Sequence, residues 1–139
     1  MSSQPEPGLY HIISPVPSET SGDKLAMKFN GDNQPITVTP LLDYSNPAQH
    51  WILENFNELK CIIPRNNPDL KANWYESAIY TWAGGHPCWD IVAEQGYYFI
   101  QGGSSFWSIQ NALNGALILT SHDKTGEKQR WIFSKVAPN

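Results

Sequence analysis

The sequence predicts an all-β domain built from twelve short strands in three similar units. Eleven prolines interrupt nearly every window long enough for a helix of three turns. The short segments between these prolines are rich in Ile, Tyr, Trp, Phe and Thr, the residues that favour strands. In addition, a phrase centred on tryptophan recurs roughly every 40 residues, which is typical of a fold assembled from repeated units.

The expected strands follow a regular order along the chain. Each unit is expected to contain an opening strand, a middle pair around a polar turn and a closing strand that starts at tryptophan. The stretch 111–116 can hold a single helical turn at most. Turn signals such as Asn30–Asn33 and Asn114–Gly115 separate the strands. Eleven of the twelve expected strands can be assigned to residues, namely 9–13, 24–28, 36–39, 51–53, 59–63, 78–82, 89–92, 97–100, 106–109, 116–120 and 131–133.

The recurring phrase defines the three units. It reads QHWILE in the first unit, PCWDIV in the second and QRWIFS in the third, with its tryptophans at Trp51, Trp89 and Trp131. The corresponding units are residues 7–55, 56–94 and 95–137. Because side chains alternate between the two faces of a strand, we expect each of these tryptophans to point into the core. Three such units predict a closed body with few exposed strand edges.

Composition narrows the classes of function. A length of 139 residues fits a single domain, and no apolar run is long enough for a transmembrane helix. The formal charge of −4 and the lack of a basic cluster argue against a nucleic-acid or anionic-membrane surface. Charged residues make up only 16% of the chain, which suits neutral ligands or protein partners. The first residues show no signal peptide, so a cytoplasmic location is expected, with release without a classical signal as the alternative.

The Gln-x-Trp phrases and the opening strand Gly8–Ile13 resemble the β-trefoil of ricin-B-type lectins. The resemblance extends over essentially the whole chain and implies one domain over residues 1–139. The opening strand is most similar to mushroom β-trefoil proteins. These include cytosolic ricin-B-like lectins, mycocypin-type protease inhibitors and the lectin-like light subunit associated with mushroom tyrosinase. The resemblance therefore implies a β-trefoil and leaves several functions open, because these proteins share one scaffold.

The resemblance to lectins implies a sugar site in the first unit. Tyr44 offers an aromatic platform for a pyranose face, with Asp43, Asn46 and Gln49 as polar partners for its hydroxyl groups. Every unit departs from the ricin-type motif, because Ala48 precedes the first Gln, proline replaces the second and lysine precedes the third. The expected function is glycan or glycoprotein binding through degenerate sites. Buried Gln and Trp in the phrases are also explained by packing alone.

Two alternatives belong to other classes of function. A β-trefoil protease inhibitor could use the proline-braced loop 64–71, with Arg65 or Lys71 entering the acidic pocket of a trypsin-like enzyme. Because this loop lies in another unit than Tyr44, changing both basic residues is expected to leave sugar binding intact. A subunit that binds a protein partner is the third possibility.

Catalysis, metals and cofactors are not expected. No known catalytic or nucleotide-binding motif is present, and His86 and Cys88 are separated by a proline that disturbs a shared strand face. Four histidines recur at near-repeat intervals but occupy non-equivalent positions, so a zinc site is not expected. Cys61 and Cys88 are expected to be reduced thiols, with one disulfide as the alternative.

The remaining tryptophans, Trp74, Trp82 and Trp107, lie outside the repeated phrase. Core packing is the favoured interpretation for each. The alternative is an exposed aromatic patch formed by Trp74, Tyr75 and Trp82 near Gly84–Gly85, which would mark a binding surface.

Overall fold

The computed structural model describes residues 4–18, 21–75, 78–83, 88–103, 105–109, 117–121 and 127–136. These residues form an all-β structure with two short 3₁₀ turns, η1 (Pro47–Gln49) and η2 (Glu127–Gln129). The strands in chain order are β1 (Gly8–Ser14), β2 (Leu25–Lys28), β3 (Thr37–Pro40), β4 (Trp51–Phe56), β5 (Leu59–Pro64), β6 (Lys71–Tyr75), β7 (Ala78–Trp82), β8 (Asp90–Glu94), β9 (Tyr97–Gly102), β10 (Ser105–Ile109), β11 (Leu117–Ser121) and β12 (Ile132–Lys135).

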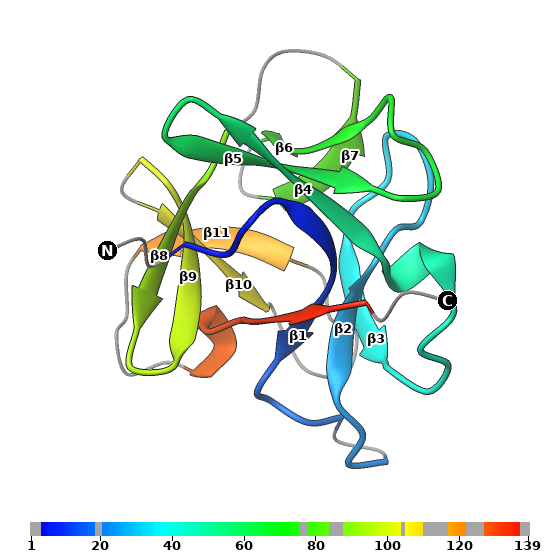
Figure 1. The fold of residues 1–139 in the computed structure, drawn as a ribbon. Helices are drawn as coiled ribbons and strands as arrows, with labels where there is room; N and C mark the ends of the chain where they lie inside the picture. Colours follow the sequence, from blue (N-terminus) through cyan, green and yellow to red (C-terminus); the bar gives the residue numbers. More distant parts are fainter. Residues whose placement is uncertain are drawn as a thin grey trace.

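Six of these strands pair in a closed ring, in the order β1, β4, β5, β8, β9 and β12. The last strand returns to the first, with Ile12 opposite Phe133, and Figure 1 shows β12 in red alongside β1. The β5–β8 and β9–β12 contacts are each a single antiparallel bridge, Lys60 to Trp89 and Tyr98 to Trp131. Closure satisfies the backbone groups that an open sheet would leave at its edges.

The other six strands form three hairpins, β2–β3, β6–β7 and β10–β11. Neighbouring hairpins are joined by backbone contacts. The Ile36 N–H donates to the Ile79 carbonyl at 2.8 Å, and Ile118 pairs with Ala78. The Thr81 hydroxyl adds a bond to the Gly31 carbonyl at 2.7 Å. A strand ring capped by three hairpins is the β-trefoil arrangement, which confirms the predicted fold class.

Three tryptophans occupy equivalent places in the core, as predicted. Trp51, Trp89 and Trp131 are each no more than 1% exposed. Each pairs with an opening strand of the ring, opposite Tyr10, Lys60 and Tyr98 respectively. Their indole N–H groups donate to carbonyls of the hairpin strands, namely those of Met27 at 2.9 Å, Ala72 at 3.1 Å and Trp107 at 3.3 Å.

Several local expectations were wrong. β6 was not predicted, because Lys71, Ala72 and Asn73 have weak strand preference and form a strand through pairing with β7. Lys71 therefore lies in a strand opposite Trp82, and not in the preceding loop. The two 3₁₀ turns before Trp51 and Trp131 were also not anticipated. The single turn expected at 111–116 lies outside the described residues.

The tryptophans outside the repeated phrase differ from one another. Trp107 is fully buried, as core packing predicts, and its ring packs edge-on against Trp89. Trp74 and Trp82 are 51% and 39% exposed, so the core interpretation was wrong for these two. Cys61 and Cys88 are both thiols. Among the described residues, no helix is long and apolar enough to span a membrane.

We expect Trp→Ala at position 51, 89 or 131 to lower the free energy of unfolding by about 3–5 kcal/mol, because each change opens a large cavity and leaves a carbonyl without its donor. Urea unfolding followed by circular dichroism measures this loss. Trp82→Ala is the control and should cost less, since its side chain is already 39% exposed. Equal losses at all four positions would contradict the core role.

Candidate functional site

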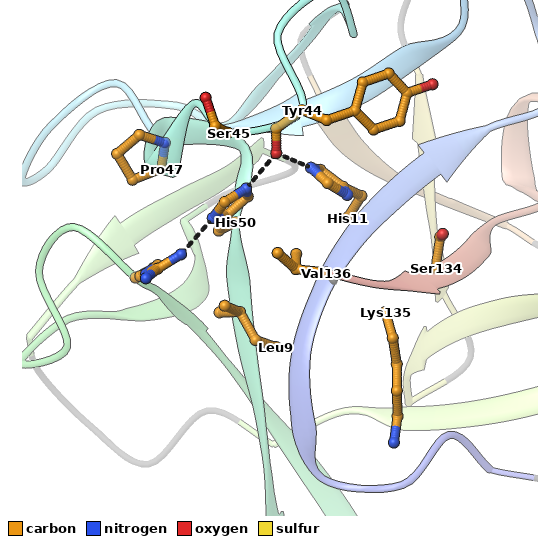
Figure 2. Close-up of a pocket in the computed structure, with 10 residues that line it drawn as sticks. Leu9, His11, Tyr44, Ser45, Pro47, His50, Ser134, Lys135 and Val136 are labelled. Atoms are coloured by element: carbon orange, nitrogen blue, oxygen red, sulfur yellow. Dashed lines mark hydrogen bonds between the residues drawn. The ribbon is translucent and has the colours of Figure 1, made fainter. Parts of the chain in front are cut away.

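A cavity of about 730 Å³ lies where the two ends of the ring meet. It is bounded by β1, the segment between β3 and β4, the residue after β5, and β12 with its following residue. Figure 2 shows Leu9 and Val136 in its centre, between His50 and Lys135. The lining residues are Leu9, His11, Tyr44, Ser45, Pro47, His50, Arg65, Ser134, Lys135 and Val136.

The carbonyl oxygen of Tyr44 holds this segment in place. It lies 3.2 Å from Nε2 of His11 and 2.9 Å from Nε2 of His50, and Figure 2 shows both imidazoles converging on it. Both histidines are buried, whereas Tyr44 is 55% exposed. The two imidazoles pack edge-on at 4.9 Å, and His11 also packs edge-on against the Tyr44 ring at 5.4 Å. The Tyr44 backbone is therefore anchored while its phenol remains open to a ligand.

Arg65 fixes the tautomer of His50. Its Nη1 lies 2.7 Å from Nδ1 of His50, and a guanidinium can only donate. Nδ1 must therefore be the acceptor, so that His50 carries its proton on Nε2 and donates it to the Tyr44 carbonyl. The chain of donors thus runs from Arg65 through His50 to Tyr44, and His11 donates to the same oxygen from β1.

The β4–β5 hairpin brings Arg65 to His50. A two-residue turn at Asn57 and Glu58 sets Trp51 opposite Pro64, so the next pair outward is His50 and Arg65. The Arg65 N–H donates to the His50 carbonyl at 3.1 Å. Asn57 adopts a left-handed φ of 55°, which asparagine tolerates in tight turns. Counting register from this turn is the signal in the sequence that could have placed Arg65 beside the first unit.

Of the four residues expected to bind sugar, only Tyr44 lines the cavity. Asp43 accepts from the Ser45 N–H at 3.0 Å and from its hydroxyl at 2.6 Å. Asn46 caps η1 by accepting from the Ala48 N–H at 3.1 Å. These contacts explain the two polar side chains as parts of a turn.

Gln49 is buried and belongs to the scaffold. Its amide nitrogen lies 3.0 Å from Oγ1 of Thr39 and 3.3 Å from the Thr39 and Pro40 carbonyls. These contacts tie the end of β3 to η1, which supports the packing explanation of the Gln-x-Trp phrase. Arg65, Pro47 and the residues of β12 were not expected at a sugar site.

The basic residues of the alternative inhibitor loop are separated by the fold. Arg65 is exposed at the cavity and bonded to His50, whereas Lys71 is half-buried at the start of β6. The premise that Arg65 lies apart from the Tyr44 site was wrong, because both residues line one cavity, and the effect of changing Arg65 and Lys71 on sugar binding stays a prediction. The unit boundaries in sequence do not separate sites in space, since hairpin pairing crosses them.

The charges around the cavity are unevenly distributed. Arg65 and Lys135 line it, and Lys135 lies 3.6 Å from the exposed Glu6 carboxylate. Burial lowers the pKa of His11, nearby His50 lowers it further, and the bond to the Tyr44 carbonyl opposes this shift. The contacts with Ser45 lower the pKa of Asp43.

No metal centre is indicated in the part of the chain that the structure describes, because no three His, Cys, Asp or Glu side chains gather there. His11 and His50 meet at the Tyr44 carbonyl, where their Nε2 atoms serve as donors. His86 and His122, and the Gly84–Gly85 portion of the expected aromatic patch, lie outside the described residues.

Comparison with known proteins identifies a family. A family model described as CCL2 lectin-like matches residues 8–131. No curated protein matches the chain. The specific relatives expected from the sequence, including mycocypins and the tyrosinase light subunit, stay predictions.

Solved structures share the fold at low sequence identity. A mosquitocidal holotoxin superposes with a TM-score of 0.82 at 16% identity, over 96% of this chain and 18% of its own length. The Polyporus squamosus lectin, solved with an influenza-binding sialylated epitope, has a TM-score of 0.76 at 16% identity, over 96% of this chain and half of its own. A proteinase inhibitor from Coprinopsis cinerea has a TM-score of 0.68 at 13% identity, over 96% of this chain and 100% of its own. The fold is thus shared by lectins and an inhibitor.

We expect stability to fall as the pH drops from about 7.5 to about 5, in part because of His11. Its folded pKa is lowered, whereas in the unfolded chain it titrates near the usual value of about 6.5. The contribution of His11 to the free energy of unfolding is therefore complete above the unfolded pKa and is lost as the pH falls through the lower folded pKa. His11→Gln keeps an N–H donor without a titrating ring, so urea midpoints of this variant should depend less on pH. An unchanged dependence would contradict the role of His11.

Proposed function

Because the chain belongs to the CCL2 lectin-like family, we propose that it is a non-enzymatic carbohydrate-binding protein that holds a glycan in the cavity beside Tyr44. The observation that carries this assignment is the Tyr44 ring, which is 55% exposed although its backbone carbonyl accepts from two buried histidines. A fixed backbone reduces the ordering entropy that a loop loses when it binds a ligand.

The cavity combines the two surfaces that a pyranose needs. The Tyr44 ring can cover the apolar face of a sugar, and Leu9 and Val136 supply a further apolar surface in the centre of the cavity. Ser134 lines the cavity and its hydroxyl can hydrogen-bond to sugar oxygens, whereas the Ser45 hydroxyl donates to Asp43 and can only accept from a sugar. Hydrogen bonds to these groups would favour a saccharide over a purely apolar molecule.

Three finer points belong to the proposal. The Gln-x-Trp positions act in the scaffold, so the protein is a lectin with degenerate ricin-type sites. Its twelve strands form the three pseudo-symmetric repeats 7–55, 56–94 and 95–137 of a single domain. It acts in the cytoplasm.

Two alternatives are retained for the test. An inhibitor acting through Arg65 and Lys71 is compatible with the fold, which the Coprinopsis cinerea inhibitor shares. The Arg65 guanidinium would then have to leave His50, which lies 2.7 Å away, before entering a protease pocket. A lectin-like subunit that binds a protein partner is the second alternative.

A glycan array tests the assignment with three proteins, the natural chain, Tyr44→Ala and Trp74→Ala. We expect the natural chain to bind at least one glycan and Tyr44→Ala to bind it at least about tenfold more weakly, because the aromatic platform is lost. The melting temperature should hardly change, since the Tyr44 ring is exposed and its carbonyl is retained.

Trp74→Ala is the matched control, because it removes another half-exposed aromatic ring in β6, away from the cavity. Loss of binding in this variant alone would move the site to β6. Failure of every glycan to bind, together with stoichiometric inhibition of trypsin, would replace the lectin assignment by the inhibitor alternative.

A further inference from the structure

The charge of the cavity points to a particular class of saccharide. Among the described residues that line it, Arg65 and Lys135 are cationic and none is acidic. Asp43 lies on the same segment as Tyr44 but is engaged with Ser45 and does not line the cavity. A site that receives a neutral sugar through carboxylate and amide acceptors needs such groups facing the ligand, and this cavity presents cationic donors instead.

Arg65 is prepared to bind an anion. One guanidinium nitrogen, Nη1, is bonded to His50, and the Arg65 backbone N–H is bonded to the His50 carbonyl. These contacts fix the root of the side chain and one edge of its planar head. The other guanidinium N–H groups can still form the paired hydrogen bonds that suit a carboxylate. Arg65 is exposed, so an external ligand can reach it.

Lys135 is less suited than Arg65 to bind an anion in a fixed geometry. Its amine lies 3.6 Å from the Glu6 carboxylate, and both side chains are largely exposed. Solvent and salt screen such a pair, so Lys135 adds positive potential at the rim without a fixed geometry. Arg65 is therefore the residue that distinguishes an acidic from a neutral ligand.

We propose that the cavity recognises a saccharide bearing a carboxylate, with Arg65 binding that carboxylate while Tyr44 covers the sugar ring. This inference rests on the carbohydrate-binding function proposed above. The shared chemistry is a carboxylated pyranose, which occurs both in sialylated glycans and in uronic-acid oligosaccharides.

Isothermal titration with matched pairs of sugars tests this inference. The pairs are 3′-sialyllactose with lactose, and trigalacturonate with its methyl ester. We expect at least one acidic sugar to bind about tenfold or more tightly than its neutral partner, with an affinity that falls as salt is added. The pair that shows the preference identifies the source of the carboxylate.

Variants separate the role of Arg65 from overall charge. Arg65→Ala should abolish the preference, whereas Lys71→Ala removes the same charge from β6 and should preserve it. Arg65→Lys should retain only part, because an ammonium cannot form the paired bonds. Equal binding of acidic and neutral sugars overturns the carboxylate inference and leaves the lectin function standing. Failure of all glycans on the array overturns both.

A second inference comes from the register between β5 and β8. Lys60 and Trp89 exchange both backbone hydrogen bonds, each at 2.9 Å, so they form a hydrogen-bonded antiparallel pair. The next pair, Cys61 and Cys88, is then directly opposed at a non-hydrogen-bonded position, where side chains approach most closely. That separation lies within the range that a disulfide spans. Cys61 is buried and Cys88 is partly exposed.

We propose that Cys61 and Cys88 form a reversible disulfide with each other, and that a glutathione-type disulfide is the oxidant. The Cys88 thiolate attacks one sulfur of oxidised glutathione and releases one glutathione thiolate. The Cys61 thiolate then attacks the Cys88 sulfur of the mixed disulfide and releases the second. Two protein thiols are oxidised, one glutathione disulfide is reduced, and the two thiol protons end on the released glutathiones.

Redox titration in glutathione buffers tests this pairing. We expect both thiols to disappear together, with a mass loss of two hydrogens and a rise in melting temperature on the order of 10 °C, because the bond closes a loop between β5 and β8. Cys61→Ser should leave Cys88 able to form only a mixed disulfide with glutathione. Persistence of both thiols in oxidised glutathione, or mixed disulfides alone in the natural chain, would overturn the proposal.

Discussion

The fold depends on three buried indole N–H groups. A tryptophan ring fills much of the core, and burying its N–H without an acceptor costs free energy, as it does for Nε1 of Trp107, which is buried without a hydrogen-bond partner. Trp51, Trp89 and Trp131 each find one on a hairpin strand, at Met27, Ala72 and Trp107 respectively. The same side chain that fills the core therefore connects the ring of six strands to a hairpin. Around Trp89 the space is so limited that a Cβ on Gly102 would come within 2.6 Å of the ring, which explains the glycine there.

Closure of the ring also creates the cavity. β1 supplies Leu9 and His11, and Ser134 to Val136 come from the other end of the chain. These two segments meet because β1 pairs with β12. The remaining side chains that line the cavity come from the β3–β4 segment and from the residue after β5. A ligand in this cavity would therefore contact elements whose positions depend on the completed fold, and its binding is coupled to global folding.

The repeated scaffold could be predicted from the sequence more fully than the cavity. Trp51, Trp89 and Trp131 could be predicted because one large apolar residue recurring in a short phrase reflects a strong packing demand. β6 could not, because its polar residues are held in a strand by their partner β7. Tyr44 was found from residue type, whereas Arg65 was assigned to a separate loop. Placing Arg65 required the register of the β4–β5 hairpin, and placing Val136 required closure of the whole ring.

The cavity is lined by two cationic side chains, although the chain as a whole carries a net negative charge. The low share of charged residues, 16%, suggested neutral ligands or protein partners, but screening limits the reach of each exposed charge to about 8–10 Å at 0.10–0.15 M salt. The cationic side chains that line the cavity are Arg65 and Lys135, and the Glu6 and Asp43 carboxylates lie nearby. Arg65 has the strongest influence because His50 holds it, and His50 can do so only while its Nδ1 is an acceptor. The bonds that position Tyr44 and Arg65 therefore use the two nitrogens of one imidazole, with Nδ1 accepting from Arg65 and Nε2 donating to the Tyr44 carbonyl.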